Sequence, residues 1–293
     1  MRQIRKLYMQ NENGARWDLN GGQHTYASHL SGFGFSLTVG FADLTRGFFL
    51  PINSKNDPQN SLAMTLTFTR SPYETYQQFL SWISAAKRLT LIYAPSGTTE
   101  YCRDVSISFL QKSELTAVGW LECPCSLVCL TPWYLPSPST LSLEAGGTDT
   151  SKRYDYEYSD ALMYGEDSTA SISGTIAGAG HIPAALDLTF FGEILNPRIR
   201  LRGNISGKIY GICSIATELK PSDRLMYSSR YDESYVKKIS ASGDETDLLD
   251  NIDLQTVPFF RIPTDEPCTI MLEADDAFVG HADLLVSYYY RSV

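Results

Sequence analysis

The sequence predicts a mainly β protein of the β-rich α+β class, built from two domains and containing a single helix. In many short segments apolar residues alternate with polar ones, which is typical of half-buried strands. Aromatic residues, which favour strands, make up 12% of the chain. Only the segment that follows residue 71 repeats its apolar residues at helical spacing. The 293 residues are enough for one large domain or two ordinary ones.

The first 135 residues are predicted to form an N-terminal domain of strands around that helix. Asn and Gly at residues 11–14 predict a turn after an opening strand. A run of polar residues at 53–61 predicts a loop. Alternating apolar residues predict the strands 33–41, 62–70, 89–94, 105–111 and 115–130.

The helix is predicted from its start signal and from its apolar face. Ser71 can cap the first turn, Pro72 suits the first helical position, and Glu74 completes a capping box. The apolar face then consists of Tyr73, Tyr76, Phe79, Leu80 and Ile83.

Trp82 lies about 120° from the centre of that face, at roughly 100° per residue. It either covers a flank of its own domain or lies in an interface between subunits, where tryptophan is enriched. We take Trp82 as a candidate interface residue. Trp82→Ala would then weaken assembly and leave the thermal unfolding of the protomer nearly unchanged.

Residues 136–293 are predicted to form a second, C-terminal domain. Pro136 and Pro138 alternate with serine in a short stiff linker that marks the boundary. Beyond it, turn signals separate strands at fairly regular spacing and no long helical pattern appears, as in β-sandwiches. The predicted strands are 168–176, 186–191, 198–202, 209–219, 225–229, 259–262, 268–273 and 283–291.

Charge is unevenly spread between the two halves. Residues 1–140 hold 11 Lys and Arg against 9 Asp and Glu, and residues 141–293 hold 13 against 24. The halves therefore carry net charges of +2 and −11, which make up the total of −9. Sequence-specific nucleic-acid binding needs a basic footprint and is not expected. No apolar run is long enough to span a bilayer, so membrane insertion is not expected either.

Three cysteines, Cys123, Cys125 and Cys129, lie close together in the sequence, but their spacing is not that of a zinc site. A zinc site usually carries CxxC pairs, often with histidine nearby. These cysteines instead share odd positions with Leu121 and Leu127, so in a strand they face the same way. We expect them to be small core residues rather than metal ligands.

No motif predicts catalysis or a cofactor. The histidines have no metal-ligand spacing, and no nucleophile elbow of the GxSxG type occurs. The glycine-rich residues 174–180 resemble a phosphate loop only loosely and are more typical of a flexible loop. Several adjacent acid pairs fall in predicted loops, where carboxylates are usually solvated. The chain is predicted not to be an enzyme.

Arg198, Arg200 and Arg202 alternate with apolar residues on one predicted strand, so three guanidinium groups project from one face. One interpretation is a solvated face that deters edge pairing. They can also be read as a salt-bridged contact with an acidic neighbour, because arginine is enriched at interfaces. They complete the set of candidate interface residues.

Several motifs, in their order and spacing, resemble the phage distal tail protein (Dit) family. In the first half these are the alternating strand 33–41, the helix SPYETYQQFLSWIS, the strand LTLIYAP and the long strand that ends in CLTPWY at 129–134. In the second half they are LDLTFFGEILNPRI at 186–199, PSDRLMYSS at 221–229, FFRIP at 259–263 and the final SYYYR. The stretch TDEP at 264–267 departs from the family, which often has a glycine-containing turn there.

This resemblance implies an N-terminal β-sandwich-like domain with one helix that forms the wall of a hexameric ring. It implies a galectin-like β-sandwich as the C-terminal domain, at the periphery of the ring. The ring would join the tail tube protein to the tail-tip or hub protein and support receptor-binding or peripheral baseplate proteins. The chain would be made and assembled in the cytoplasm of the host bacterium and end in the tail tip or baseplate of the virion.

Two other functions stay open at this point. A stand-alone carbohydrate-binding module or adhesin would need an aromatic and polar platform, which Asn204, Arg224, Tyr227 and Tyr231 could supply. A glycan-degrading tail enzyme would need two of the acidic residues to face each other across a cleft.

Overall fold

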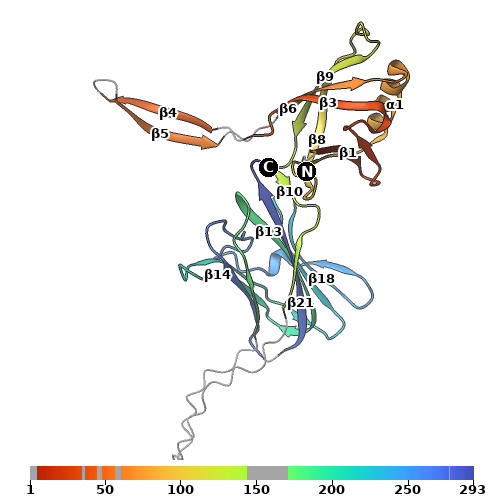
Figure 1. The fold of residues 1–293 in the computed structure, drawn as a ribbon. Coiled ribbons are helices and arrows are strands. Elements are labelled where there is room, and N and C mark those ends of the chain that lie inside the picture. The colour runs from red at the N-terminus through yellow and green to blue at the C-terminus, as the bar shows by residue number, and fades with distance from the viewer. Residues whose placement is uncertain (1–4, 35–36, 45–47, 57–60, 144–170, 277) are drawn as a thin grey trace, which may run out of the picture. The chain divides into compact units, whose positions relative to one another are not determined.

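The computed structural model describes residues 5–34, 37–44, 48–56, 61–143, 171–276 and 278–293 (Figure 1). The chain divides into two compact units, residues 1–136 with 289–293, and residues 137–288. The last residues join the first unit because Tyr289 and Tyr290 pair with Tyr134 and Trp133. A single boundary at residue 135 therefore does not describe the first unit, which also contains residues 289–293.

The first unit is an antiparallel sheet assembly with one helix among its described residues. Its strands pair in the order β2-β1-β7-β8-β9-β6-β3, and β10 also pairs with β8. The elements are β1 (Lys6–Asn11), β2 (Arg16–Asp18), η1 (Gly22–His24), β3 (Thr25–Ser31), β4 (Leu37–Leu44), β5 (Phe48–Asn56), β6 (Ser61–Phe68), α1 (Pro72–Ala85), β7 (Leu89–Ala94), β8 (Tyr101–Leu110), β9 (Leu121–Cys129) and β10 (Trp133–Tyr134).

Alternation along β6 and β9 builds the core of the first unit. Every second residue of each strand is buried, and β6 pairs with β9 from end to end. The predicted strand face of Leu121, Cys123, Cys125 and Leu127 is fully buried. Tyr76 and Phe79 of α1 pack into the same core, where Phe68 lies 5.7 and 5.9 Å from their ring centroids.

The start of α1 differs from the predicted capping box. Ser71 adopts a left-handed conformation with φ of 41° and makes no side-chain cap hydrogen bond. Pro72 does occupy the first turn. The Thr75 hydroxyl instead donates to the Arg70 carbonyl at 2.8 Å, which ties the helix to the end of β6. The sequence signal therefore placed the helix start correctly but misassigned its hydrogen bonds.

The predicted strand 33–41 and loop 53–61 are both corrected in part. The strand β4 begins only at Leu37, and Phe33 instead packs against Tyr93 and Trp133 at 5.1 and 5.8 Å. Residues 53–56 continue β5, since Leu37 pairs with Asn56. Backbone pairing makes this strand despite its polar side chains. Residues 35–36 and 57–60 lie outside the described part of the chain.

The second unit is a two-sheet sandwich. One sheet has the order β19-β18-β17-β13-β21-β11, with β16 also paired to β13, and the other has the order β12-β20-β14-β15. The elements are β11 (Ser139–Leu143), β12 (Ser171–Ile176), β13 (Ile182–Leu195), β14 (Arg198–Gly203), β15 (Ile209–Ser214), β16 (Glu218–Leu219), β17 (Arg224–Ser229), β18 (Ser234–Ile239), β19 (Glu245–Asp247), η2 (Leu249–Asn251), β20 (Cys268–Glu273) and β21 (Val279–Tyr290).

The two sheets enclose a continuous apolar core. Leu188 and Phe190 of β13 belong to the same buried cluster as Ile199 of β14 and Ile270 of β20. Such alternation on facing strands is the usual basis of a sandwich core. The prediction of a mainly β chain with one helix is confirmed for the described residues.

Some strands of the second unit differ from the predicted ones. The segment 259–262 forms only an isolated bridge between Ala184 and Ile262, although Phe260 and Ile262 are buried. Three short strands, β11, β18 and β19, were not predicted. Serine in β11, lysine in β18 and acidic residues in β19 interrupt the apolar alternation on which the prediction depended.

Candidate assembly surfaces

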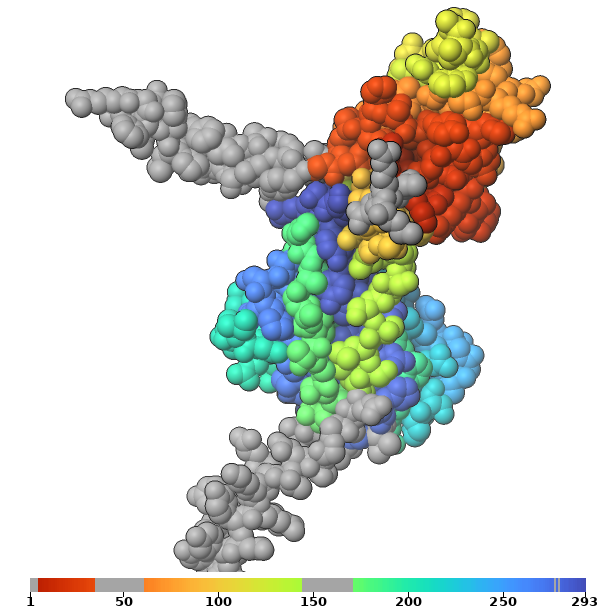
Figure 2. Space-filling view, in the orientation of Figure 1, coloured from red at the N-terminus to blue at the C-terminus, as the bar shows by residue number. Residues whose placement is uncertain are grey.

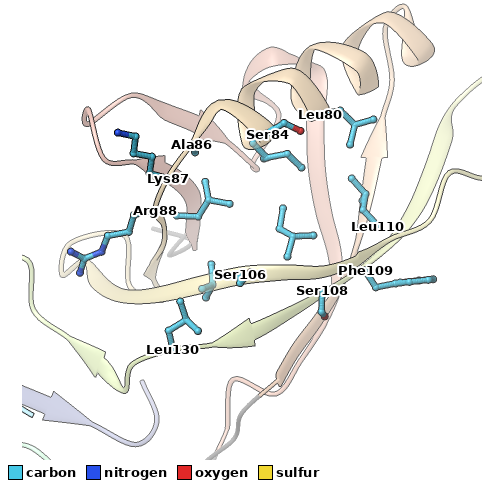
Figure 3. A pocket seen from close by; sticks show the side chains of 14 residues that line it. Leu80, Ser84, Ala86, Lys87, Arg88, Ser106, Ser108, Phe109, Leu110 and Leu130 are labelled. Carbon is cyan, nitrogen blue, oxygen red and sulfur yellow. The ribbon is translucent and has the colours of Figure 1, made fainter. Parts of the chain in front are cut away.

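A groove lies on the first unit between the C-terminal half of α1 and strand β8. Its volume is about 430 Å³, and we call it the α1–β8 groove. Figure 3 shows Leu80 and Leu110 at one end and Lys87 and Arg88 at the other. The groove therefore has an apolar end and a basic end. It is lined by Leu80, Ile83, Ser84, residues 86–89, residues 105–110 and Leu130.

A β-bulge shapes the apolar end of this groove. Ile107 pairs with Leu127, but Phe109, two residues on, pairs with the adjacent Ser126, so β8 has one residue more than β9. Beyond this bulge, Leu110 packs against the core and Phe109 turns outward, 49% exposed. Bulges commonly redirect a side chain in this way. Leu130, at 63% exposure, adds a second apolar side chain to the lining.

Arg88, at the basic end, is anchored to a buried carboxylate. The Arg88 guanidinium donates to Asp104, whose other oxygen accepts from the Thr90 hydroxyl and the Tyr134 hydroxyl, both at 2.9 Å. The hydrogen bond to Asp104 raises the pKa of Arg88 above its usual value. Burial, together with the charge of Asp104, raises the pKa of Tyr134. This network fixes the direction of Arg88.

A tight turn follows β8, and we call residues 111–120 the β8–β9 turn. The Thr116 carbonyl accepts from the Gly119 amide at 2.8 Å, and the Thr116 amide donates to the Trp120 carbonyl at 2.8 Å. Gly119 has φ of +78°, which suits glycine. Three apolar side chains of this turn are exposed, Leu115 at 43%, Val118 at 67% and Trp120 at 43%. The turn is thus an apolar projection with a hydrogen-bonded backbone.

Neither the α1–β8 groove nor the β8–β9 turn was predicted from the sequence, because residues 115–130 were assigned to a single strand. Gly119 inside a pattern of 16 residues was a signal against one continuous strand. The outward position of Phe109 had no such signal, because Val105, Ile107 and Phe109 keep perfect alternation in the sequence.

Trp82 packs against its own unit. Its ring lies 5.8 Å from that of Trp17 and is stacked 6.3 Å from that of Phe79. The side chain is half-buried and belongs to the edge of the first core. These contacts correspond to the first of the two interpretations considered above, a cover on the flank of its own domain. A role between subunits stays a prediction.

The three arginines of β14 do project from one face, but two already have acidic partners in the same chain. Arg200 lies 3.2 Å from Glu273, and Arg198 lies 3.9 Å from Asp275. Both acids belong to β20 or directly follow it, and β20 pairs with β14. Arg202 is exposed. The predicted contact with an acidic neighbour is therefore made within the chain, and an interface role for this face stays a prediction.

The residues considered for sugar binding are not brought together. Tyr227 is buried, and its hydroxyl donates to the Pro258 carbonyl at 3.0 Å. Arg224 lies over the Phe191 ring, and Tyr231 is stacked under Arg261 at 3.9 Å. Asn204 follows β14 on the other sheet and accepts from Thr269. The structure gives no common platform from these residues.

The cysteines and acids do not form a reactive centre in the described part of the chain. Burial raises the pKa of the Cys125 thiol to about 12, and no group of potential ligands suited to a metal ion occurs there. The Glu266 carboxylate accepts hydrogen bonds from the amides of Ile205 and Ser206 and from the hydroxyls of Ser206 and Tyr210. This carboxylate organises a turn. The acid pair at residues 166–167 lies outside the described residues.

Within the described ranges, no helix is both long enough and apolar enough to cross a membrane. The search of curated proteins gives no match to the sequence.

The family comparison concerns the first unit. Residues 6–130 match the family described as the distal tail protein, N-terminal domain. The first unit is the N-terminal domain of a phage distal tail protein. The match covers the unit that carries the α1–β8 groove and the β8–β9 turn. The resemblance stated from the motifs is confirmed, and so is the prediction that the chain is a structural, non-enzymatic component of the virion tail tip.

Solved structures show that the fold of this distal tail protein extends over both units. A chain of the phage P2 baseplate, in its activated conformation with calcium, is 14% identical and has a TM-score of 0.59. The alignment covers 99% of this chain and 100% of that one. The SPP1 Dit protein, described as a paradigm of the hub adsorption apparatus in phages infecting Gram-positive bacteria, is 6% identical with a TM-score of 0.59. That alignment covers 96% of this chain and 99% of SPP1 Dit.

Proposed function

We propose that this distal tail protein closes into a hexameric ring at the tail tip, with the first unit as the wall of the ring. The ring joins the tail tube protein on one side to the tail-tip or hub protein on the other. The family match carries the proposal, because it falls on residues 6–130. A ring of identical subunits needs a heterologous interface, in which two different surfaces of each subunit meet.

The distribution of exposed apolar side chains supports this role for the first unit. Among the residues of the first unit whose burial the structure describes, most exposed large hydrophobic residues fall between residues 109 and 130. Exposed apolar side chains that gather on one part of a soluble protein often mark a binding site. The exposed residues in this range are Phe109, Leu115, Val118, Trp120, Val128 and Leu130.

The second unit, in this proposal, lies at the periphery of the ring and supports receptor-binding or peripheral baseplate proteins. Its two-sheet core needs no partner strands, since both sheets bury their apolar faces against each other. The related P2 chain is part of a baseplate, which supports a position among other tail proteins.

Light scattering of the purified full chain tests the ring. A particle of six protomers, each of 32.7 kDa, is expected at micromolar concentration. Negative-stain electron microscopy should show annular particles in the same sample. A chain that stays monomeric at high concentration, alone and with tail tube protein, would contradict the proposal.

A further inference from the structure

The α1–β8 groove and the β8–β9 turn complement each other in shape. The turn is a projection with three exposed apolar side chains, and the groove is a hollow with apolar lining at one end. None of the residues 111–120 lines the groove, so the turn leaves the groove of its own chain open. One unit therefore presents a projection and a separate recess.

The two surfaces also complement each other in charge. Glu114 and Glu122 lie beside the apolar residues of the turn, and both are exposed. Lys87 and Arg88 lie at the basic end of the groove, where Arg88 pairs with Asp104 and the Glu12 carboxylate accepts the backbone amides of Lys87 and Arg88. Lys112 is the basic residue of the turn, and its ammonium lies over the Tyr73 ring of the same chain at 4.7 Å. The turn thus offers carboxylates to the Lys87 ammonium of the groove, an arrangement that favours one orientation of docking.

The turn is suited to docking because its backbone is ordered before binding. Two backbone hydrogen bonds and a bond from the Trp120 amide to the Thr116 hydroxyl, at 3.1 Å, close it. A preformed projection loses less conformational entropy on binding than a flexible loop does. An exposed tryptophan such as Trp120 is a suitable anchor for an apolar recess.

We infer that the β8–β9 turn of one copy of this chain seats in the α1–β8 groove of the next copy. The inference rests on the proposed ring and names its contact. A projection on one copy that enters a recess on another is a heterologous contact, which closes into a ring when the rotation between copies allows it. The apolar side chains of the turn meet Phe109, Leu110 and Leu130, and the carboxylates meet Lys87.

Two single variants and their mixture test the contact. Val118→Glu damages the turn and Leu130→Glu damages the groove, and both residues are more than 60% exposed, so the fold should persist. Each variant alone should need at least about tenfold more protein than the wild type to assemble. Mixed together, the intact turn of Leu130→Glu can enter the intact groove of Val118→Glu. The mixture should therefore form 1:1 dimers of twice the 32.7 kDa protomer mass.

Ile205→Glu is the matched control, because Ile205 is 78% exposed and lies on the second unit. It should assemble as the wild type does. Circular dichroism checks that each variant folds. If a glutamate variant unfolds, the serine variant at the same position, Val118→Ser or Leu130→Ser, replaces it. If either variant forms rings as readily as the wild type, this contact is not the one that closes the ring. The proposal of a ring would then remain supported. A mixture that stays monomeric at every concentration would show that the turn and the groove bind something other than each other. A monomeric wild type would instead contradict the proposed function.

Discussion

Asp104 connects three strands and one loop of the first unit through its carboxylate. Its partners are Arg88 before β7, Thr90 on β7 and Tyr134 on β10. The side chain is only 6% exposed, so its charge depends on these donors rather than on water. A single residue thereby holds the basic end of the groove in place.

Replacement of Asp104 by alanine should therefore lower the free energy of unfolding by about 1–3 kcal/mol, because the half-buried hydroxyls of Thr90 and Tyr134 lose their acceptor. Urea unfolding of the full chain measures this change. Asp232→Ala is a control on an exposed acid of the second unit and should change stability by less than about 0.5 kcal/mol. Equal values for the two variants would contradict the assignment.

Trp82 is a second case at the residue scale. Its stacking on Trp17 and Phe79 predicts that Trp82→Ala lowers the free energy of unfolding by about 1–3 kcal/mol. The interface interpretation predicted almost no change in the unfolding of the protomer. Urea unfolding separates the two interpretations of Trp82 when it is measured in a protein that does not assemble, such as the Leu130→Glu variant. Trp120→Ala in the same protein is the comparison, because Trp120 is exposed. An unchanged midpoint for Trp82→Ala would favour the interface.

At the scale of the element, the β14–β15 connection depends on one acid. Glu266 accepts from two backbone amides and the Ser206 hydroxyl of this connection and from the Tyr210 hydroxyl of β15, and these hydrogen bonds lower the pKa of Glu266 to about 2. A carboxyl group whose pKa is lower in the folded state stabilises the fold fully above its ordinary value of 4.5. This stabilisation is lost as the pH falls from 4.5 towards 2.

Glu266→Gln should therefore be less stable than the wild type at pH 7, and the difference should shrink as the pH approaches 2. Urea midpoints at several pH values between 7 and 2 measure it. Glu245→Gln is an exposed control that should keep the pH dependence of the wild type. If the urea midpoints of the wild type and of Glu266→Gln change in parallel over this pH range, Glu266 is not the source of the pH dependence.

At the scale of the whole molecule, the chain returns to its first unit at the end. Tyr290 pairs with the fully buried Trp133, and the Tyr290 ring lies 5.4 Å from the Tyr101 ring. The C-terminal residues thus complete a unit that begins almost three hundred residues earlier. Such closure ties the termini of the chain to one compact body.

Ending the chain after Tyr288 should weaken the first unit by about 1–3 kcal/mol, because β10 loses its pairing with β21 and keeps only β8. Hydrogen exchange should show the loss of protection at β10 and the adjacent part of β8, while the strands β12, β14 and β20 keep theirs. Uniform loss over both units would contradict a local effect.

Local pattern accounts for most elements that were predicted correctly. Alternation in β6, β7, β9 and β20 and the start signal of α1 appear in the sequence because each depends on neighbours within one segment. The strands β11, β18 and β19 form because backbone pairing with a neighbour outweighs a weak side-chain pattern. The motifs that suggested the distal tail family likewise lie in strongly patterned segments.

By itself, the sequence determined the mainly β class, the helix and the resemblance to distal tail proteins, all of which depend on residue order along short stretches. Only the tertiary structure decided the groove, the outward turn of Phe109, the packing of Trp82 and the pairing of two arginines of β14 with Glu273 and Asp275. Each of these depends on which distant strand lies beside a residue and in what register, and a shift of one residue, as at the bulge of β8, moves a side chain from the core to the surface.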